Sequence, residues 1–128
     1  MKVLTIKEPW ASLIINGYKK YEFRSWKTKY RGKILIHAGM TLDYKKSLLF
    51  KNYNLDYHKG EIIGEADIVD CILVDQEFDR KLHKINKDVY GDNHVDLYAW
   101  KLDNIKIYDK PIPIKGKLGL WNYEKRKV

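Results

Sequence analysis

The sequence predicts a mainly β fold of the α+β class: a small β-barrel of about six strands with two or three short helices. Apolar and polar residues alternate along several short segments, which is the pattern of half-buried strands. Helical spacing is confined to three short stretches. The strands also lack the regular alternation with helices that characterises a doubly wound parallel sheet.

The strand pattern recurs along the whole chain. We expect strands over residues 2–6, 20–24, 33–38, 61–74, 97–102 and 105–108, with residues 116–121 closing the fold. Gly64 lies inside the longest of these segments, where a glycine is typical of a β-bulge. The pair Asp103-Asn104 separates the last two strand-like runs and predicts a tight hairpin turn. Pro111 and Pro113 then indicate an edge or crossing segment, because proline cannot donate to a β-ladder.

Helical character is found in residues 9–16, 43–53 and 76–87. Pro9 suits the first position of a helix, because its missing N–H has no partner there in any case. Gly17 is a typical stop after the last turn of this first helix. We expect loops over residues 25–31, 54–60 and 90–96.

The composition is that of one folded domain, residues 1–128. Hydrophobic residues make up 45% of the chain, which excludes a disordered sequence. The single cysteine, Cys71, excludes an intrachain disulfide, and its apolar neighbours predict a buried, inert thiol. We therefore expect a reducing, cytoplasmic environment.

No apolar run approaches the roughly 20 residues of a membrane-spanning helix, so we expect no membrane partner. The strand pattern begins at Lys2, so we also expect no signal peptide.

Positive charge is concentrated in the first half of the chain. The net charge is +8, and the first 60 residues carry 13 Lys and Arg but only 4 Asp and Glu. The remaining residues carry 12 Lys and Arg against 13 Asp and Glu. This asymmetry favours an anionic partner over a uniformly solvated, lysine-rich surface.

The densest basic segment interleaves cations with aromatic rings. Its cations are Lys19, Lys20, Arg24, Lys27, Lys29, Arg31 and Lys33, and its aromatic residues are Tyr21, Phe23, Trp26 and Tyr30. Cations attract phosphate and aromatic rings stack on bases, so the segment is typical of a nucleic-acid or nucleotide site. A single acid, Glu22, lies among them and indicates a contact more selective than charge attraction.

Several motifs are shared with a known family. The first 38 residues contain EPWASLI, then GYK, EFRSW and YRG, and an apolar strand that ends in IHA. Near the other end, KG and LGLW follow Pro113. Together these motifs resemble the ASCH domain (activating signal cointegrator homology domain), and the resemblance extends over nearly the whole chain. It implies a PUA-like β-barrel, related to domains of RNA modification and modified-base reading.

In this resemblance, Lys19, Glu22 and Arg24 line a cleft beside the barrel. Arg24 offers a planar fork for a phosphate or a base edge. Glu22 can accept a hydrogen bond from an exocyclic amine, and Lys19 can bind phosphate or act as an acid or base. An intramolecular ion pair on a solvated strand face is the alternative interpretation of the same residues.

Neighbouring residues complete the predicted site. We expect ligand contacts from Trp10, Ser25 and Trp26, although Trp10 also fits a buried helical stripe and Trp26 fits a loop anchor. Contacts to the nucleic-acid backbone are expected from Lys27, Lys29, Tyr30, Arg31 and Lys33.

The histidines predict no metal site. His37 ends an apolar strand, where a hydrogen-bonded core histidine is expected. His58, His83 and His94 have no metal-ligand spacing with one another or with Cys71. The chain also has no phosphate-binding glycine loop, so we predict neither metal nor cofactor.

These features predict a module that binds RNA or another single-stranded nucleic acid and holds one base or modified nucleoside in a small pocket. The rival hypothesis is an enzyme, since some small ASCH proteins are similar to acetylcytidine amidohydrolases, which use a lysine, a threonine and a distant glutamate. Lys19 matches that lysine, but Glu22 stands in place of the threonine. Glu65 and Glu77 are only candidates for the third group. Ribonuclease activity is also associated with the family, but the sequence has no paired histidines that would support it. A protein-interaction domain is the third hypothesis.

Overall fold

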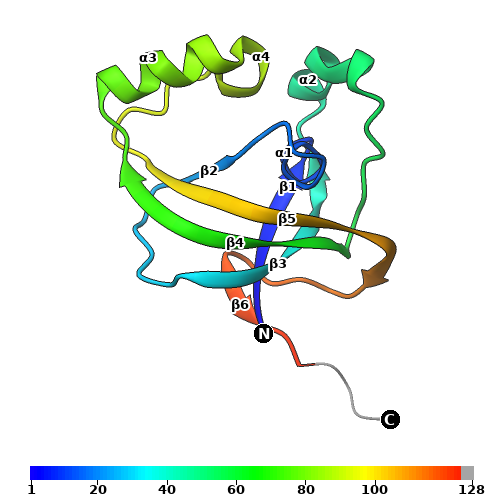
Figure 1. Cartoon of the computed structure of the whole chain (residues 1–128). Helices are drawn as coiled ribbons and strands as arrows, with labels where there is room; N and C mark the ends of the chain where they lie inside the picture. The colour runs from blue at the N-terminus through cyan, green and yellow to red at the C-terminus, as the bar shows by residue number, and fades with distance from the viewer. Residues whose placement is uncertain (125–128) are drawn as a thin grey trace.

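One curled, six-stranded sheet forms the body of the molecule, and most of the short helices lie at one end of it (Figure 1). The computed structural model describes residues 1–124. The strands are β1 (Lys2–Glu8), β2 (Tyr21–Arg24), β3 (Gly32–Leu42), β4 (Glu61–Leu73), β5 (Tyr98–Pro113) and β6 (Leu120–Asn122). The helices are α1 (Trp10–Ile15), α2 (Tyr44–Ser47), the 3-10 helix η1 (Leu48–Tyr53), α3 (Gln76–Ile85) and α4 (Lys87–Tyr90).

The sheet is mixed and open. Its strand order is β2-β5-β4-β3-β1-β6. β1 and β3 are parallel, and the other neighbours are antiparallel. The predicted mainly β, α+β class is confirmed, but the sheet is not closed into a barrel, because the edge strands β2 and β6 do not pair within residues 1–124. A side-chain hydrogen bond connects the two ends of the curled sheet: Arg24 Nη2 in β2 donates to the Thr5 carbonyl in β1 at 2.7 Å.

The predicted hairpin at Asp103-Asn104 is wrong. β5 continues through both residues and pairs with the long strand β4 on either side of them. Asn104 does adopt a left-handed conformation, with φ of 50°, but it lies in a bulge where the register jumps from Asp103–Asp67 to Lys106–Glu65. β4 and β5 are antiparallel neighbours, and the long connection between them contains α3 and α4.

The register shifts predicted near Gly64 are present in β4. Its pairing with β3 skips a residue beside Gly64, and so does its pairing with β5. Glycine is required here by close packing, because an added Cβ would lie 2.1 Å from Ile15 Cδ1 and 2.4 Å from the Lys106 carbonyl oxygen. This close approach lets α1 pack directly on the sheet.

Two clusters of buried side chains share α1. Ala11, Ile14 and Ile15 pack into the sheet core, and Leu13 packs into a second cluster with residues from the helices at the sheet's end. The helix predicted over residues 9–16 is therefore confirmed as a bridge between the sheet and those helices. None of the helices within residues 1–124 is long and apolar enough to cross a membrane.

Three local expectations need adjustment. The helix predicted over residues 76–87 ends at Ile85, because Asn86 Oδ1 accepts from the backbone N–H groups of Asp88 and Val89 and so begins α4. The beginning of the predicted loop 90–96 therefore belongs to α4. Cys71 is only half-buried, since β4 reaches the surface near its end.

Candidate functional site

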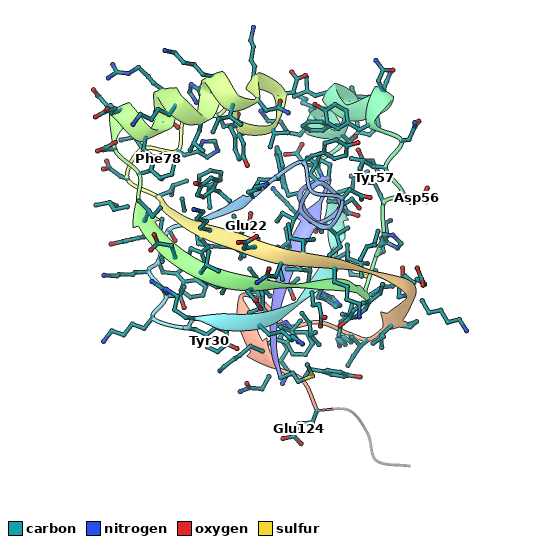
Figure 2. All side chains as sticks on the ribbon, in the orientation of Figure 1. Glu22, Tyr30, Asp56, Tyr57, Phe78 and Glu124 are labelled. Atoms are coloured by element: carbon teal, nitrogen blue, oxygen red, sulfur yellow. The ribbon has the colours of Figure 1, made fainter. Side chains whose placement is uncertain are left out.

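A cleft of about 1250 Å³ is bounded by the edge strand β2, by β1 and by two segments from the second half of the chain, residues 89–94 and 113–118. Lys19, Glu22 and Arg24 all contribute to its wall. Figure 2 shows Glu22 near the centre of the molecule, whereas Tyr30 lies toward its periphery. The strand period explains the placement, because Glu22 and Arg24 are two residues apart and point to the same face of β2.

Glu22 is held between two cations. Lys19 Nζ donates to Glu22 Oε1 at 3.0 Å and to the Tyr21 carbonyl at 2.5 Å. Arg24 Nη2 donates to Glu22 Oε2 at 2.9 Å. Lys19 is 3% exposed and Glu22 is 7% exposed. The predicted ion pair is therefore present, but it lies buried in the cleft wall and not on a solvated strand face.

Burial and charge act on this trio in opposite directions. Burial disfavours the ionised form of Glu22, yet the nearby charges of Lys19 and Arg24 outweigh it and hold the pKa of Glu22 below its ordinary value. Burial lowers the pKa of Lys19, and the attraction of Glu22 offsets only part of this effect. The trio carries one positive charge more than it carries negative charge, which makes this part of the cleft attractive to anions.

Aromatic rings surround the ammonium group of Lys19. Its Nζ lies 4.9 Å from the ring centroid of Phe23 and 5.6 Å from that of Trp10, distances at which a cation interacts with the ring face. Phe23 stacks on His94 with centroids 3.8 Å apart. Trp10 packs edge-on against Phe50 and also lines the cleft, so both predicted positions of this ring, core and cleft border, are realised.

A comparison with known proteins identifies the family. The family model of the ASCH domain matches residues 4–114. The chain belongs to the ASCH domain family. Activating signal cointegrator 1 from Homo sapiens and from Mus musculus are each 28% identical to it over 138 residues, covering 96% of this chain and 22% of the relative. The ASCH domain described here thus spans about a fifth of the length of these relatives.

Solved structures share the PUA-like fold of this ASCH domain. A crystal structure of ASCH from Zymomonas mobilis superimposes with a TM-score of 0.63 at 15% identity, covering 97% of this chain and 87% of that chain. A mutant of the Zymomonas mobilis protein gives a TM-score of 0.60 at 16% identity, covering 97% and 90%. At this level of identity the likeness concerns the fold alone.

The basic aromatic loop of this ASCH domain lies outside the cleft wall formed by the described residues. Its members in the predicted site are Ser25, Trp26, Lys27, Lys29, Tyr30, Arg31 and, at the start of β3, Lys33. The loop is organised by its own contacts: Trp26 packs edge-on against Trp100 with centroids 4.6 Å apart, and Tyr30 Oη donates to the Lys33 carbonyl at 2.6 Å. The backbone contacts predicted for this loop stay a prediction.

Four exposed lysines that the sequence did not single out as contacts line the cleft instead. They are Lys7, Lys59, Lys115 and Lys117. The wall that carries the last two is fixed by His37, whose Nε2 lies 2.8 Å from the Ile114 carbonyl oxygen. Gly116 abuts the same ring, since an added Cβ would lie 2.3 Å from His37 Cε1. His37 is buried and hydrogen-bonded, as predicted, and its packing positions the lysines.

Proposed function

We propose that this ASCH domain binds RNA or another single-stranded nucleic acid, with one unpaired or modified nucleotide entering the cleft. The observation that carries the proposal is the combination of a cation–carboxylate–cation trio in the cleft wall, of which Lys19 and Glu22 are buried, with exposed lysines in the same wall. Exposed lysines supply a phosphate-attracting surface. The bases of a double strand are stacked and paired, whereas an unstacked base of a single strand is free to enter the cleft beside Glu22.

The polar groups of the trio retain hydrogen-bonding capacity for a guest. Arg24 Nε is buried and has no hydrogen-bond partner among residues 1–124. The Arg24 side chain as a whole is 20% exposed, so a base carbonyl or a phosphate oxygen would meet the guanidinium group at its exposed edge. Each oxygen of Glu22 accepts one bond from a cation, which leaves lone pairs for an exocyclic amine. The half-buried ring of Trp10 offers an edge or face to the same guest.

Glu22 is better suited to binding than to general-base catalysis. A general base works best when its pKa lies near the operating pH. The pKa of Glu22 is instead held below its ordinary value by its two cationic neighbours, and both of its oxygens are engaged. For this reason we propose a binding module and do not propose the amidohydrolase activity.

A salt-dependent titration tests the proposal. We expect a fluorescently labelled single-stranded RNA of about 10 nucleotides to bind in an anisotropy assay. Its affinity should fall with salt, with a slope of about −0.7 in log–log form for each phosphate neutralised. A double-stranded RNA of the same sequence should bind more weakly. Absence of binding, or an affinity that salt leaves unchanged, would contradict the proposal.

A further inference from the structure

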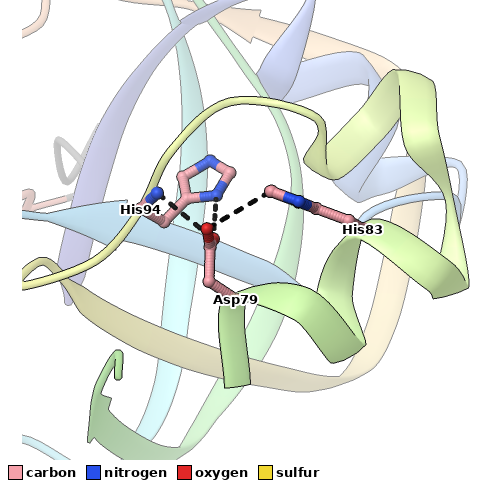
Figure 3. A group of neighbouring side chains, drawn as sticks. All are labelled: Asp79, His83 and His94. Carbon is pink, nitrogen blue, oxygen red and sulfur yellow. Dashed lines mark hydrogen bonds and ion pairs between the residues drawn. The ribbon is translucent and has the colours of Figure 1, made fainter. Parts of the chain in front are cut away.

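Three potential metal ligands converge beside the cleft, from two separate parts of the chain (Figure 3). Asp79 and His83 lie one turn apart on α3, so their side chains share one face of that helix. His94 comes from the segment after α4. Asp79 Oδ1 lies 3.3 Å from His94 Nδ1, and Asp79 Oδ2 lies 3.4 Å from His83 Nε2. One ligand atom from each residue falls within 4.8 Å of the other two.

We propose that Asp79, His83 and His94 bind a divalent transition-metal ion of the zinc class. Zinc takes imidazole nitrogen and carboxylate oxygen at about 2.0–2.1 Å in a tetrahedron. Neighbouring ligand atoms in such a tetrahedron are about 3.3–3.4 Å apart by geometry. The two nitrogen–oxygen distances are close to that spacing and longer than a well-formed hydrogen bond, which is about 2.9–3.0 Å. They end on different oxygens of Asp79, Oδ1 for His94 and Oδ2 for His83, so a small rotation of the carboxylate would bring one oxygen within reach of both nitrogens.

The surroundings favour a preformed site. Asp79 is 6% exposed and His94 is 8% exposed. The backbone N–H of His94 donates to Asp79 Oδ1 at 3.2 Å and so orients the carboxylate, as hydrogen-bond donors to the ligands of metal sites do. The side chain of His83 is 36% exposed, so the ion would enter from this side and leave its fourth position open to water. His83 Nε2 would exchange its contact with the Asp92 carbonyl, at 2.8 Å, for the ion.

The position of His94 gives this ion a structural consequence. His94 lines the cleft and stacks on Phe23, the ring beside Lys19. An ion held by the cluster would fix this wall of the cleft to α3. The inference is independent of the nucleic-acid proposal, because it concerns metal affinity alone.

The test uses the full chain, treated with chelator and then titrated with ZnCl₂ by calorimetry. We expect one equivalent to bind and His83→Gln to weaken the affinity at least about tenfold. His58→Gln is the matched control, since His58 pairs with Glu61 away from the cluster, and should leave the affinity unchanged. Co²⁺ in the same protein should give the intense visible absorption of a four-coordinate site. Circular dichroism checks that both variants fold; this is expected because both histidines are partly exposed.

Two results would overturn the inference. One is the absence of saturable one-to-one zinc binding to the folded chain. The other is equal zinc affinity in the unmodified protein and His83→Gln, which would place the ion elsewhere.

Discussion

Replacing Glu22 with glutamine is expected to lower the free energy of unfolding by about 3–5 kcal/mol. The substitution leaves the buried ammonium of Lys19 and the guanidinium of Arg24 without their shared counter-charge. Urea unfolding at pH 7, followed by tryptophan fluorescence, measures the change. Glu77→Gln is the control: Glu77 and Lys81 form an exposed ion pair one turn apart on α3, so its loss should cost about 0.5 kcal/mol or less.

The stability difference between the unmodified protein and Glu22→Gln is expected to depend on pH. The folded-state pKa of Glu22 lies below its ordinary value of 4.5. Ionised Glu22 therefore contributes stability that is present above pH 4.5 and is lost as the pH falls through the folded-state pKa. The stability difference between the unmodified protein and Glu22→Gln should shrink over that range. A difference below about 1 kcal/mol at pH 7 would contradict the central role of this residue in the cleft wall.

Removing two cleft lysines is expected to weaken single-stranded RNA binding roughly tenfold at low salt. In Lys115→Gln/Lys117→Gln, two exposed cations of the cleft wall lose their charge. The log–log salt slope should become shallower by about 1.4, which corresponds to two phosphate contacts. The anisotropy titration described above measures both quantities.

The basic aromatic loop offers a control variant that removes the same amount of positive charge as the cleft double variant. Lys27 and Lys29 are exposed and lie outside the cleft wall. Lys27→Gln/Lys29→Gln should therefore affect RNA binding less than the cleft double variant does. The reverse order would favour the contacts that the sequence predicted for this loop and would contradict phosphate binding at the cleft lysines.

Local patterns predicted well where the partner residues are close in sequence. The alternation along residues 20–24 places Glu22 and Arg24 on one face of β2, and Lys19 is near enough to join them. The helix over residues 9–16 is similarly local, because its apolar spacing and its flanking proline and glycine define it. Together with the family motifs, these signals were sufficient to predict that the three side chains lie together, and their role as ligand contacts stays a prediction.

Features that depend on distant pairing could not be predicted in this way. Asn104 does adopt the left-handed conformation expected of a turn residue. Because β4 is long enough to pair with β5 on both sides of Asp103-Asn104, the two residues form a bulge within β5 and not a hairpin turn. The lysine Lys115 lines the same cleft as Lys19 because His37 holds the segment that carries it. His94 likewise joins Asp79 through the fold of α3 and α4, so the spacing of histidines along the chain carried no signal of the cluster.

The proposed binding mode places the guest in the cleft beside Lys19, Glu22 and Arg24. The indole N–H signals of the four tryptophans in a ¹H–¹⁵N NMR titration test it most directly. Trp10 lines the cleft, Trp26 lies in the basic loop, and the other two indoles are buried. Adding single-stranded RNA should shift the Trp10 indole signal strongly and the Trp26 signal little. A shift confined to Trp26 would contradict the claim and place the nucleic acid on the loop.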